Sequence, residues 1–240
     1  MLPSLLLIEL MENKRYGVEY QPIINMNDQE IYAFECLARF YDNKRNLIPP
    51  DFVFGSLHKS PLSLFQVEYE QKKLQLLNAP DHKKIFINLD QDSFYACGIE
   101  GENNPFIGLL SSYATNDIIV ELIENSEVND ARMSLAMIDS LSRNKIQTAI
   151  DDVFNPQSLI STAVIQLVDF IKLDRYVVTR KQDEDFLRLV KSIIDYAHLA
   201  GKKIVLEGIE NKDDLLFAEQ LNADYVQGYL YRDRFITIVN

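Results

Sequence analysis

The sequence has 240 residues, 47% of them hydrophobic and 25% charged, which is the composition of an ordinary globular protein and not of a disordered chain. Its formal net charge of -12 at pH 7 argues against a general nucleic-acid or anionic-membrane surface, because both require basic patches. We therefore expect no DNA partner, and an anionic substrate would need help from a metal cation.

The cysteines and the N-terminus indicate a cytoplasmic protein. Cys36 and Cys97 are the only cysteines, too few for a disulfide framework. The apolar run at the N-terminus, MLPSLLLIEL, is ten residues long and meets Glu9 and Glu12 at once, so we expect neither a signal peptide nor a membrane span. The length fits one α/β domain, and we expect residues 1–240 to form it.

The first third of the chain predicts a short helix over residues 3–13 and then a β-hairpin. Two apolar runs, Val18 to Met26 and Glu30 to Phe40, flank a turn signal and are predicted to pair as strands. Glu35 interrupts the second run, and the alternation leaves two orientations open, toward solvent or into a site. Residues 49–77 read as mostly helical.

Six later runs rich in Ile, Val, Phe and Tyr are predicted to be buried strands, at residues 83–90, 116–124, 146–153, 168–174, 202–210 and 224–231. Helical periodicity appears between them, most clearly at residues 127–143, 184–200 and 211–221. Such alternation predicts right-handed crossovers and a mainly parallel sheet. With the hairpin there are eight strands, the number that closes an α/β barrel; an open doubly wound sheet is the alternative.

A polar residue lies at or near the end of every late strand. The C-terminal ends of barrel strands meet at one mouth, so we expect these residues to converge there together with Glu35. Carboxylates gathered in a partly desolvated place repel one another, which favours a bound divalent cation. The strand-end residues are Asn88, Glu121, Asp151, Lys172, Glu207 and Gln227.

This set of side chains favours phosphoester chemistry. Carboxylates with one amide, and without His or Cys, are the oxygen ligands of Mg²⁺ or Mn²⁺. The adjacent Asp151 and Asp152 could serve two ions, and a two-metal site suits in-line displacement at phosphorus. Lys172 would neutralise charge or orient the water, and Glu207 would accept its proton.

Eight motifs resemble, in order, those of the EAL-domain cyclic-di-GMP phosphodiesterases, and they cover nearly the whole chain. They are YQPI at 20–23, FECLARF at 34–40, INL at 87–89, ELIE at 121–124, DD at 151–152, KLD at 172–174, EGIE at 207–210 and QGYL at 227–230. The resemblance implies a modified (β/α)₈ barrel of the TIM type with an antiparallel first strand. It also implies metal-dependent hydrolysis of cyclic-di-GMP to linear pGpG with two divalent ions.

The resemblance further implies a role for each matching residue. One metal would be held by Glu35, Asn88, Glu121 and Asp151, and a second by Asp151 and Asp152. Lys172 and Glu207 match the water-activating pair, and Gln227 matches a polar group near the water that they activate. The dinucleotide would contact Gln21 and Arg39, while Glu124 would hold the loop after Asp152, and Asp174 and Glu210 match supporting residues.

The chain departs from the family in the loop that follows the paired acids. Members with robust turnover carry a Phe-Gly-Thr-Gly-like run there, whereas this chain continues VFNPQ over residues 153–157. Glycine allows positive φ and close backbone approach, and Pro156 deletes an amide donor, so we expect a degenerate loop that affects the second metal and the dimer contact. Cys36 in place of Ala, and Arg234 in place of a proline, should affect substrate fit more than fold.

Two further functions stay open beside catalysis. The chain has no room for a companion cyclase, receiver or sensor segment, so we expect a stand-alone domain. Stand-alone members of the family also act as weak or inactive cyclic-di-GMP receptors, or as adaptors that bind a protein partner. Because all the metal acids are retained, the sequence favours the enzyme, with homodimer formation left open.

Overall fold

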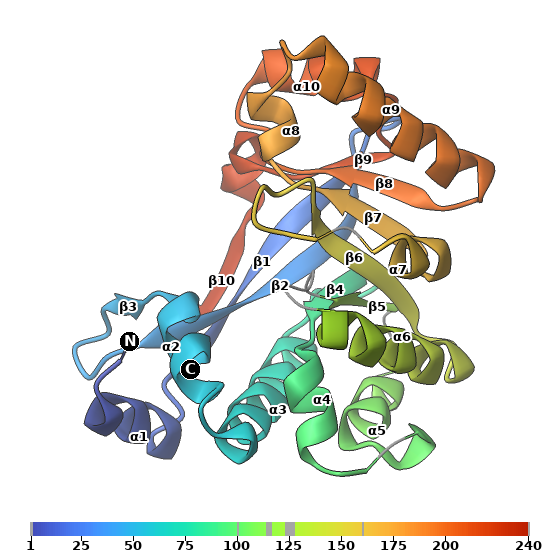
Figure 1. Ribbon diagram of the computed structural model, residues 1–240. Coiled ribbons are helices and arrows are strands. Elements are labelled where there is room, and N and C mark those ends of the chain that lie inside the picture. The colour runs from blue at the N-terminus through green and yellow to red at the C-terminus, as the bar shows by residue number, and fades with distance from the viewer. Residues whose placement is uncertain (1, 100, 114–116, 123–127, 160, 240) are drawn as a thin grey trace.

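The chain begins with a helix and a long antiparallel hairpin, both of which the sequence predicted. Helix α1 (Ser4–Glu12) precedes strands β1 (Tyr16–Asn25) and β2 (Ile31–Tyr41), which pair along most of their length (Figure 1). This computed structural model describes residues 2–99, 101–113, 117–122, 128–159 and 161–239.

Five parallel strands continue the sheet from β2 and return it to β1. They are β4 (Lys84–Asn88), β5 (Ile118–Leu122), β6 (Gln147–Val153), β7 (Phe170–Leu173) and β8 (Lys203–Leu206). The short β9 (Tyr225–Val226) pairs parallel with β8 and antiparallel with β1, and this closes the ring. The structure is therefore a modified TIM-type barrel with an antiparallel first strand, and the open doubly wound alternative is wrong.

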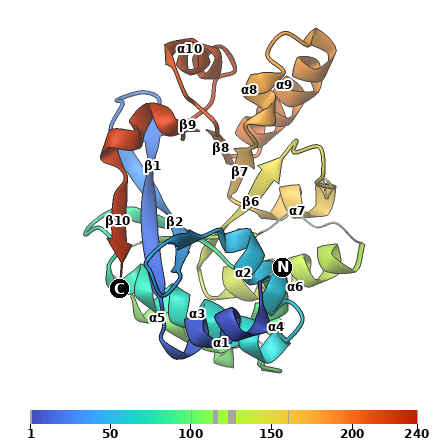
Figure 2. The same cartoon turned by 90° about the vertical axis from the view of Figure 1, so that its left-hand side faces the viewer.

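Helices cover the outside of the barrel in two groups (Figures 1 and 2). The first group runs from α2 (Pro50–Leu57), which packs against β2, to α6 (Val128–Arg143), which packs against β6, and α8 to α10 gather beside β7 and β8. The first group also contains α3 (Pro61–Leu77), α4 (Gln91–Ala96) and α5 (Pro105–Ser112); the other helices are α7 (Thr162–Leu167), α8 (Tyr176–Thr179), α9 (Glu184–Leu199) and α10 (Lys212–Gln220). The helices predicted over 127–143, 184–200 and 211–221 correspond to α6, α9 and α10.

Several elements differ from the sequence prediction. The helical region predicted over 49–77 is split into α2 and α3, and two short strands, β3 (Leu47–Ile48) and β10 (Ile236–Val239), extend the sheet beside the barrel. The strand predicted over 224–231 is only β9, because the chain turns into a 3₁₀ helix at Tyr229–Arg234.

In the part of the chain that the structure describes, side chains cap the N-termini of five helices, including three short ones. The capping oxygen in each case accepts a hydrogen bond from a backbone N–H in the first turn, which satisfies a donor that the helix leaves free. The capping residues are Asp90 for α4, Asn104 for α5, Ser161 for α7, Asp183 for α9 and Asn211 for α10.

An apolar layer fills the barrel interior toward the N-terminal ends of its parallel strands. Each barrel strand contributes one buried side chain, and Tyr32 packs against the group. Aromatic contacts tie the layer together, with Phe86 and Phe170 edge to face at 5.2 Å between ring centroids. This layer, called the floor below, consists of Ile23, Ala33, Phe86, Ile119, Ala149, Phe170, Val205 and Tyr225.

The close approach of Gly228 to the chain after β8 predicts a steric effect on stability. A Cβ at Gly228 would lie 2.2 Å from the Ile209 carbonyl oxygen, whereas a Cβ at Gly108, inside α5, would meet nothing within 4 Å. We expect Gly228→Ala to lower the free energy of unfolding by about 1–3 kcal/mol. The control Gly108→Ala should raise it by about 0.5–1 kcal/mol, because alanine is the better helix former. Urea unfolding of both variants checks this, and equal stabilities would contradict it.

Candidate functional site at the mouth of the barrel

The site is the layer of the barrel interior that lies directly above the floor. Side chains of a strand alternate between its two faces, so the residue two positions beyond each floor residue also points inward. On the seven strands after β1 these positions are polar, and on the antiparallel β1 the equivalent position lies two residues earlier, at Gln21. The others are Glu35, Asn88, Glu121, Asp151, Lys172, Glu207 and Gln227.

Lys172 lies at the centre of this layer and forms ion pairs with four carboxylates. Its side chain is fully buried, and Nζ lies 2.8 Å from Glu121 Oε1 and 2.7 Å from Glu207 Oε1. Asp151 Oδ1 is 3.0 Å away and Glu35 Oε2 is 3.5 Å away. The convergence predicted from the strand ends is confirmed, and of the two orientations left open for Glu35 the inward one is observed.

Amide side chains tie Glu35 to the neighbouring strands. Asn88 Nδ2 donates to Glu35 Oε1 at 3.1 Å, and Gln227 Nε2 donates to Glu35 Oε2 at 2.6 Å. Gln227 Nε2 also approaches Gln21 Oε1 at 3.5 Å. These contacts join strands that are far apart in the sequence and fix the Glu35 carboxylate.

A β-bulge lets two adjacent acids serve the same site. The pairing of β6 with β7 shifts register between Ile150 and Val153, and Asp152 has a φ of 56°. In a regular strand two consecutive side chains would point to opposite faces, whereas a bulge redirects one of them. Asp151 and Asp152 thereby both lie close to Glu207, with ligand oxygens within 4.8 Å of one another.

Burial and mutual repulsion shift the pKa values of these acids. Burial, followed by the charge of Glu35, raises the pKa of Glu121 well above its usual range. Burial also raises the pKa of Glu207 to about 8 and, with the repulsion of Asp151, that of Asp152 to about 7. Glu35 differs, because Lys172 and the hydrogen bonds from Gln227 and Asn88 overcome the effect of burial and lower its pKa.

The pKa of the lysine is also raised, but for a different reason. Burial alone would lower the pKa of Lys172, but the four carboxylates together raise it well above its usual value. The ammonium group is therefore charged throughout the physiological range of pH. It compensates only part of the negative charge that surrounds it.

The acids form two groups that share Asp151, and both groups fit a divalent cation. One contains Glu35, Glu121 and Asp151, and the other contains Asp151, Asp152 and Glu207. Among the described residues, both Glu121 oxygens and Asp151 Oδ1 are buried without a well-directed hydrogen bond, although they lie near Lys172. Buried carboxylate oxygens in this state are suited to bind a hard cation, and Asn88 adds an amide oxygen beside the first group.

The other residues singled out in the sequence lie around this centre. Arg39 forms an ion pair with Glu19 at 2.5 Å and lines a cavity of about 450 Å³ that also reaches Asn88. Asp174 is buried, and its Oδ1 accepts a hydrogen bond from the Tyr176 N–H at 2.7 Å. Glu210 lines the mouth itself, while Glu124 falls outside the described residues.

The mouth is a second cavity, of about 230 Å³, and it contains residues that the sequence analysis missed. Arg175 and Tyr229 line it together with Glu35, Asp151 and Glu207. Gly208 and Gly228 line it too, and each has backbone or side-chain atoms where a Cβ would lie. The EGIE and QGYL motifs thus contain glycines that the packing requires, and those glycines were the available signal for this part of the mouth.

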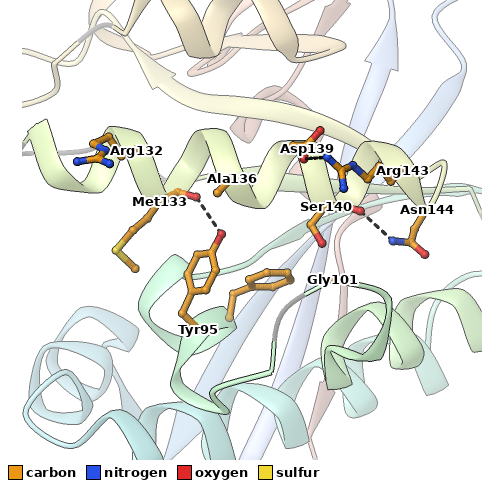
Figure 3. A pocket seen from close by; sticks show the side chains of 10 residues that line it. Tyr95, Gly101, Arg132, Met133, Ala136, Asp139, Ser140, Arg143 and Asn144 are labelled. Atoms are coloured by element: carbon orange, nitrogen blue, oxygen red, sulfur yellow. Dashed lines mark hydrogen bonds and ion pairs between the residues drawn. The ribbon is translucent and has the colours of Figure 1, made fainter.

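A larger cavity, of about 820 Å³, lies away from the barrel mouth, between α4 and α6 (Figure 3). Of the described residues that line it, Asp139 is the one with a carboxylate, and it is already paired with Arg143 at 2.7 Å. Tyr95 crosses the cavity to donate a hydrogen bond to the Met133 carbonyl oxygen. This cavity has neither the charge density nor the clustered acids of the mouth, so the chemistry is assigned to the mouth.

A closed barrel with an acid-rich layer at the C-terminal ends of its parallel strands defines a (β/α)₈-type barrel, here with an antiparallel first strand. A comparison with protein families identifies one family within that class. A sequence model of the EAL domain matches residues 6–233, and the chain belongs to the EAL-domain family, which is the cyclic-di-GMP phosphodiesterase family.

Two relatives in this family are identical to the chain at about a quarter of the aligned positions. It is 26% identical over 230 residues to the cyclic di-GMP phosphodiesterase PdeL of Escherichia coli, across 92% of this chain and 63% of PdeL. It is 24% identical over 230 residues to the bifunctional diguanylate cyclase/cyclic di-GMP phosphodiesterase MucR of Pseudomonas aeruginosa, across 92% of this chain and 33% of MucR. The chain therefore spans less than two thirds of the length of either relative.

Solved structures share the fold. The EAL domain of FimX from Pseudomonas aeruginosa, bound to cyclic-di-GMP, has a TM-score of 0.77 at 19% identity, over 94% of this chain and 93% of that chain. YkuI of Bacillus subtilis, in complex with cyclic-di-GMP and calcium, has a TM-score of 0.77 at 20% identity, over 96% of this chain and 58% of that chain. None of the helices described here combines the length and apolar character needed to cross a membrane.

The raised pKa values predict a stability that depends jointly on pH and metal. The folded pKa values of Glu207, about 8, and Asp152, about 7, exceed their ordinary values of 4.5 and 3.8. The metal-free folded state thus binds more protons than the unfolded state, so its stability should fall as pH rises from about 4 to about 8. Mg²⁺ or Mn²⁺ should raise Tm more at pH 8 than at pH 6, because fewer protons compete for the carboxylates.

Thermal unfolding with added metal or with EDTA, at both pH values, measures this effect. Asp151→Asn is the matched variant, because it removes a charge that both acid groups share without changing side-chain size. It should show less than half of the metal-induced rise in Tm. A metal response that is equal at the two pH values, or undiminished in Asp151→Asn, would contradict the metal assignment.

Proposed function

We propose that this protein is a metal-dependent phosphodiesterase that hydrolyses cyclic-di-GMP to linear pGpG. The observation that carries the proposal is the pair of acid groups that share Asp151, with Glu207 in the second group and Lys172 against both. Membership of the EAL-domain family supplies the substrate class. The names of PdeL and MucR, and the ligands of FimX and YkuI, support it.

Two divalent ions, Mg²⁺ or Mn²⁺, are part of this proposal. Glu35, Asn88, Glu121 and Asp151 would hold one ion, and Asp151 and Asp152 the other. When bound, the ions supply Lewis acidity at phosphorus and lower the pKa of water. Oxygen donors without His or Cys suit these ions better than zinc or copper.

Glu207 and Lys172 would handle the proton and the local charge. Glu207 has a pKa raised to about 8 by burial in the metal-free site, so as a carboxylate it is a stronger base than an exposed glutamate. The Lys172 ammonium, 2.7 Å from Glu207 Oε1, orients that carboxylate. Lys172 also stabilises negative charge on the reacting phosphate, and Gln227 positions the water through its place beside Glu35.

The two cavities on either side of the Glu35–Asn88 contact would receive the two halves of the dinucleotide. The mouth, about 230 Å³, reaches Glu35, and the cavity of about 450 Å³ reaches Asn88 and Arg39. Arg39 and Gln21 both contact Glu19, with Gln21 Nε2 donating to Glu19 Oε1 at 2.9 Å. We expect Glu19 to hold these two side chains ready for the ligand.

The altered loop after Asp152 makes weak turnover part of the proposal. Phe154 occupies a positive φ of 76°, a conformation that costs a residue with a Cβ more than glycine. Its ring is buried and packs edge to face on Phe186 of α9, with centroids 5.5 Å apart. We infer that packing holds this loop where the family uses glycine, and that the second ion is bound more weakly in consequence.

A cyclic-di-GMP receptor with little or no turnover is the second candidate, and the strained loop is the observation that favours it. An adaptor that acts through protein contacts, and a homodimer, stay as further alternatives.

The single domain over residues 1–240 and the cytoplasmic location belong to the proposal as well, because they rest on the sequence alone.

Removal of a metal acid should abolish hydrolysis and leave the fold intact. We expect Glu35→Gln and Asp151→Asn to lower kcat/KM for cyclic-di-GMP by at least about 100-fold, because each removes a charged ligand without changing side-chain size. The measurement is formation of pGpG with Mg²⁺ or Mn²⁺, with circular dichroism as the check on folding.

Ca²⁺ should permit binding without comparable turnover, because its looser coordination misplaces the nucleophile.

The results separate the candidate functions. Full activity in either variant would refute the metal assignment. Binding of cyclic-di-GMP without formation of pGpG in the unaltered protein would select the receptor, and absence of binding would select the adaptor.

Grafting Phe-Gly-Thr-Gly onto residues 153–156 tests the loop. If the loop weakens the second ion, the graft should raise kcat at limiting Mn²⁺ about tenfold, with less change in the affinity for cyclic-di-GMP. The matched single variant Phe154→Gly removes both the strain and the contact with Phe186. Unchanged kcat and metal dependence in the graft would mean that the native loop is an equivalent packing solution.

A further inference from the structure

We propose that Arg175 is a substrate-binding residue that pairs with the phosphate of cyclic-di-GMP that is not being cleaved. This inference rests on the proposed function and adds a residue to it. Arg175 lies directly after the KLD motif and lines the mouth of the barrel with Glu207 and Glu210.

The backbone of Arg175 is fixed at the rim of the mouth. Gly208, in the left-handed region at φ 75°, approaches so closely that a Cβ there would lie 2.3 Å from Arg175 Cβ and 3.0 Å from its Cα. On the other side, the buried Asp174 accepts a hydrogen bond from the Tyr176 N–H at 2.7 Å. An exposed arginine on an ordinary surface does not need such close packing, so this packing indicates that the position of Arg175 matters for function.

The side chain of Arg175 is exposed, and no ion pair or hydrogen bond joins its guanidinium group to another residue in the described parts of the chain. The other two cations near the site do not line the mouth. Lys172 is surrounded by four carboxylates, and Arg39 is paired with Glu19. Arg175 is also the only basic residue among the described residues that line the mouth, which carries the acids Glu35, Asp151, Glu207 and Glu210.

The chemistry of the substrate supplies a partner for this free cation. Cyclic-di-GMP carries two phosphate charges on opposite sides of its ring, and only one phosphate can lie at the acid layer. The second phosphate is left near a mouth whose other charges repel it. A guanidinium group matches phosphate oxygens with two parallel N–H donors, which a lysine cannot do.

The test compares Arg175→Ala, Arg175→Lys and Arg180→Ala. Arg180 is the control, because it is also an exposed arginine beside α8 but pairs with Asp183 and does not line the mouth. Kd for cyclic-di-GMP is measured in Ca²⁺. Steady-state hydrolysis is measured in Mn²⁺ with cyclic-di-GMP and with bis(p-nitrophenyl) phosphate, which carries a single phosphate.

We expect Arg175→Ala to raise Kd and KM for cyclic-di-GMP about tenfold, with kcat changed less than threefold. Arg175→Lys should fall between Arg175→Ala and the unaltered protein, and Arg180→Ala should match the latter. The loss in kcat/KM for Arg175→Ala should be at least fivefold greater with cyclic-di-GMP than with bis(p-nitrophenyl) phosphate.

Two results would overturn the inference alone. One is a Kd for Arg175→Ala within twofold of the unaltered protein, and the other is an equal loss with both substrates, which would place Arg175 at the reacting phosphate. If the unaltered protein binds no cyclic-di-GMP, the proposed function itself fails and the inference fails with it.

Discussion

The site depends on the charge balance around one buried ammonium group. Lys172 has no exposed surface and lies within 3.5 Å of four carboxylates, which lie on, or directly after, four different strands of the barrel. Burying Glu121 without a counter-charge would be prohibitively costly, and one ammonium cannot neutralise four acids. The barrel therefore assembles a centre with more acids than its lysine can neutralise, so the pKa values of several of them are raised, and a divalent cation can take the place of their protons.

The register of the strands is what brings these polar side chains together. The floor and the polar layer lie two residues apart on every barrel strand, so a single closed ring places all eight polar side chains at one height. A shift of one residue on a strand would turn its inward polar side chain away from the site. Among the described barrel strands after β4, only β6 departs from this regular register, at the bulge of Asp151 and Asp152. The bulge brings Asp152 to the site, whereas regular alternation would have pointed it to the other face of the sheet.

Much of this arrangement could be predicted from the sequence. Apolar runs followed by a polar residue predicted the strands, the barrel and the convergence of the six strand-end residues with Glu35. Short helices such as α4 and α7 escaped prediction because they contain less than two turns of periodic sequence and depend on caps at Asp90 and Ser161. The bulge, the pairing of Arg39 with Glu19, and the place of Arg175 against Gly208 arise from contacts between distant segments, which spacing along one chain does not encode.

The floor closes one end of the barrel. Eight tightly packed side chains, with Phe86, Phe170 and Tyr225 among them, lie below the acids, so water, ions and ligand must all reach the acids from the opposite end. A ligand that covers the mouth would trap whatever water is already inside. Cations and water would therefore have to reach the acids before such a ligand covers this end, and they would exchange again only after it leaves.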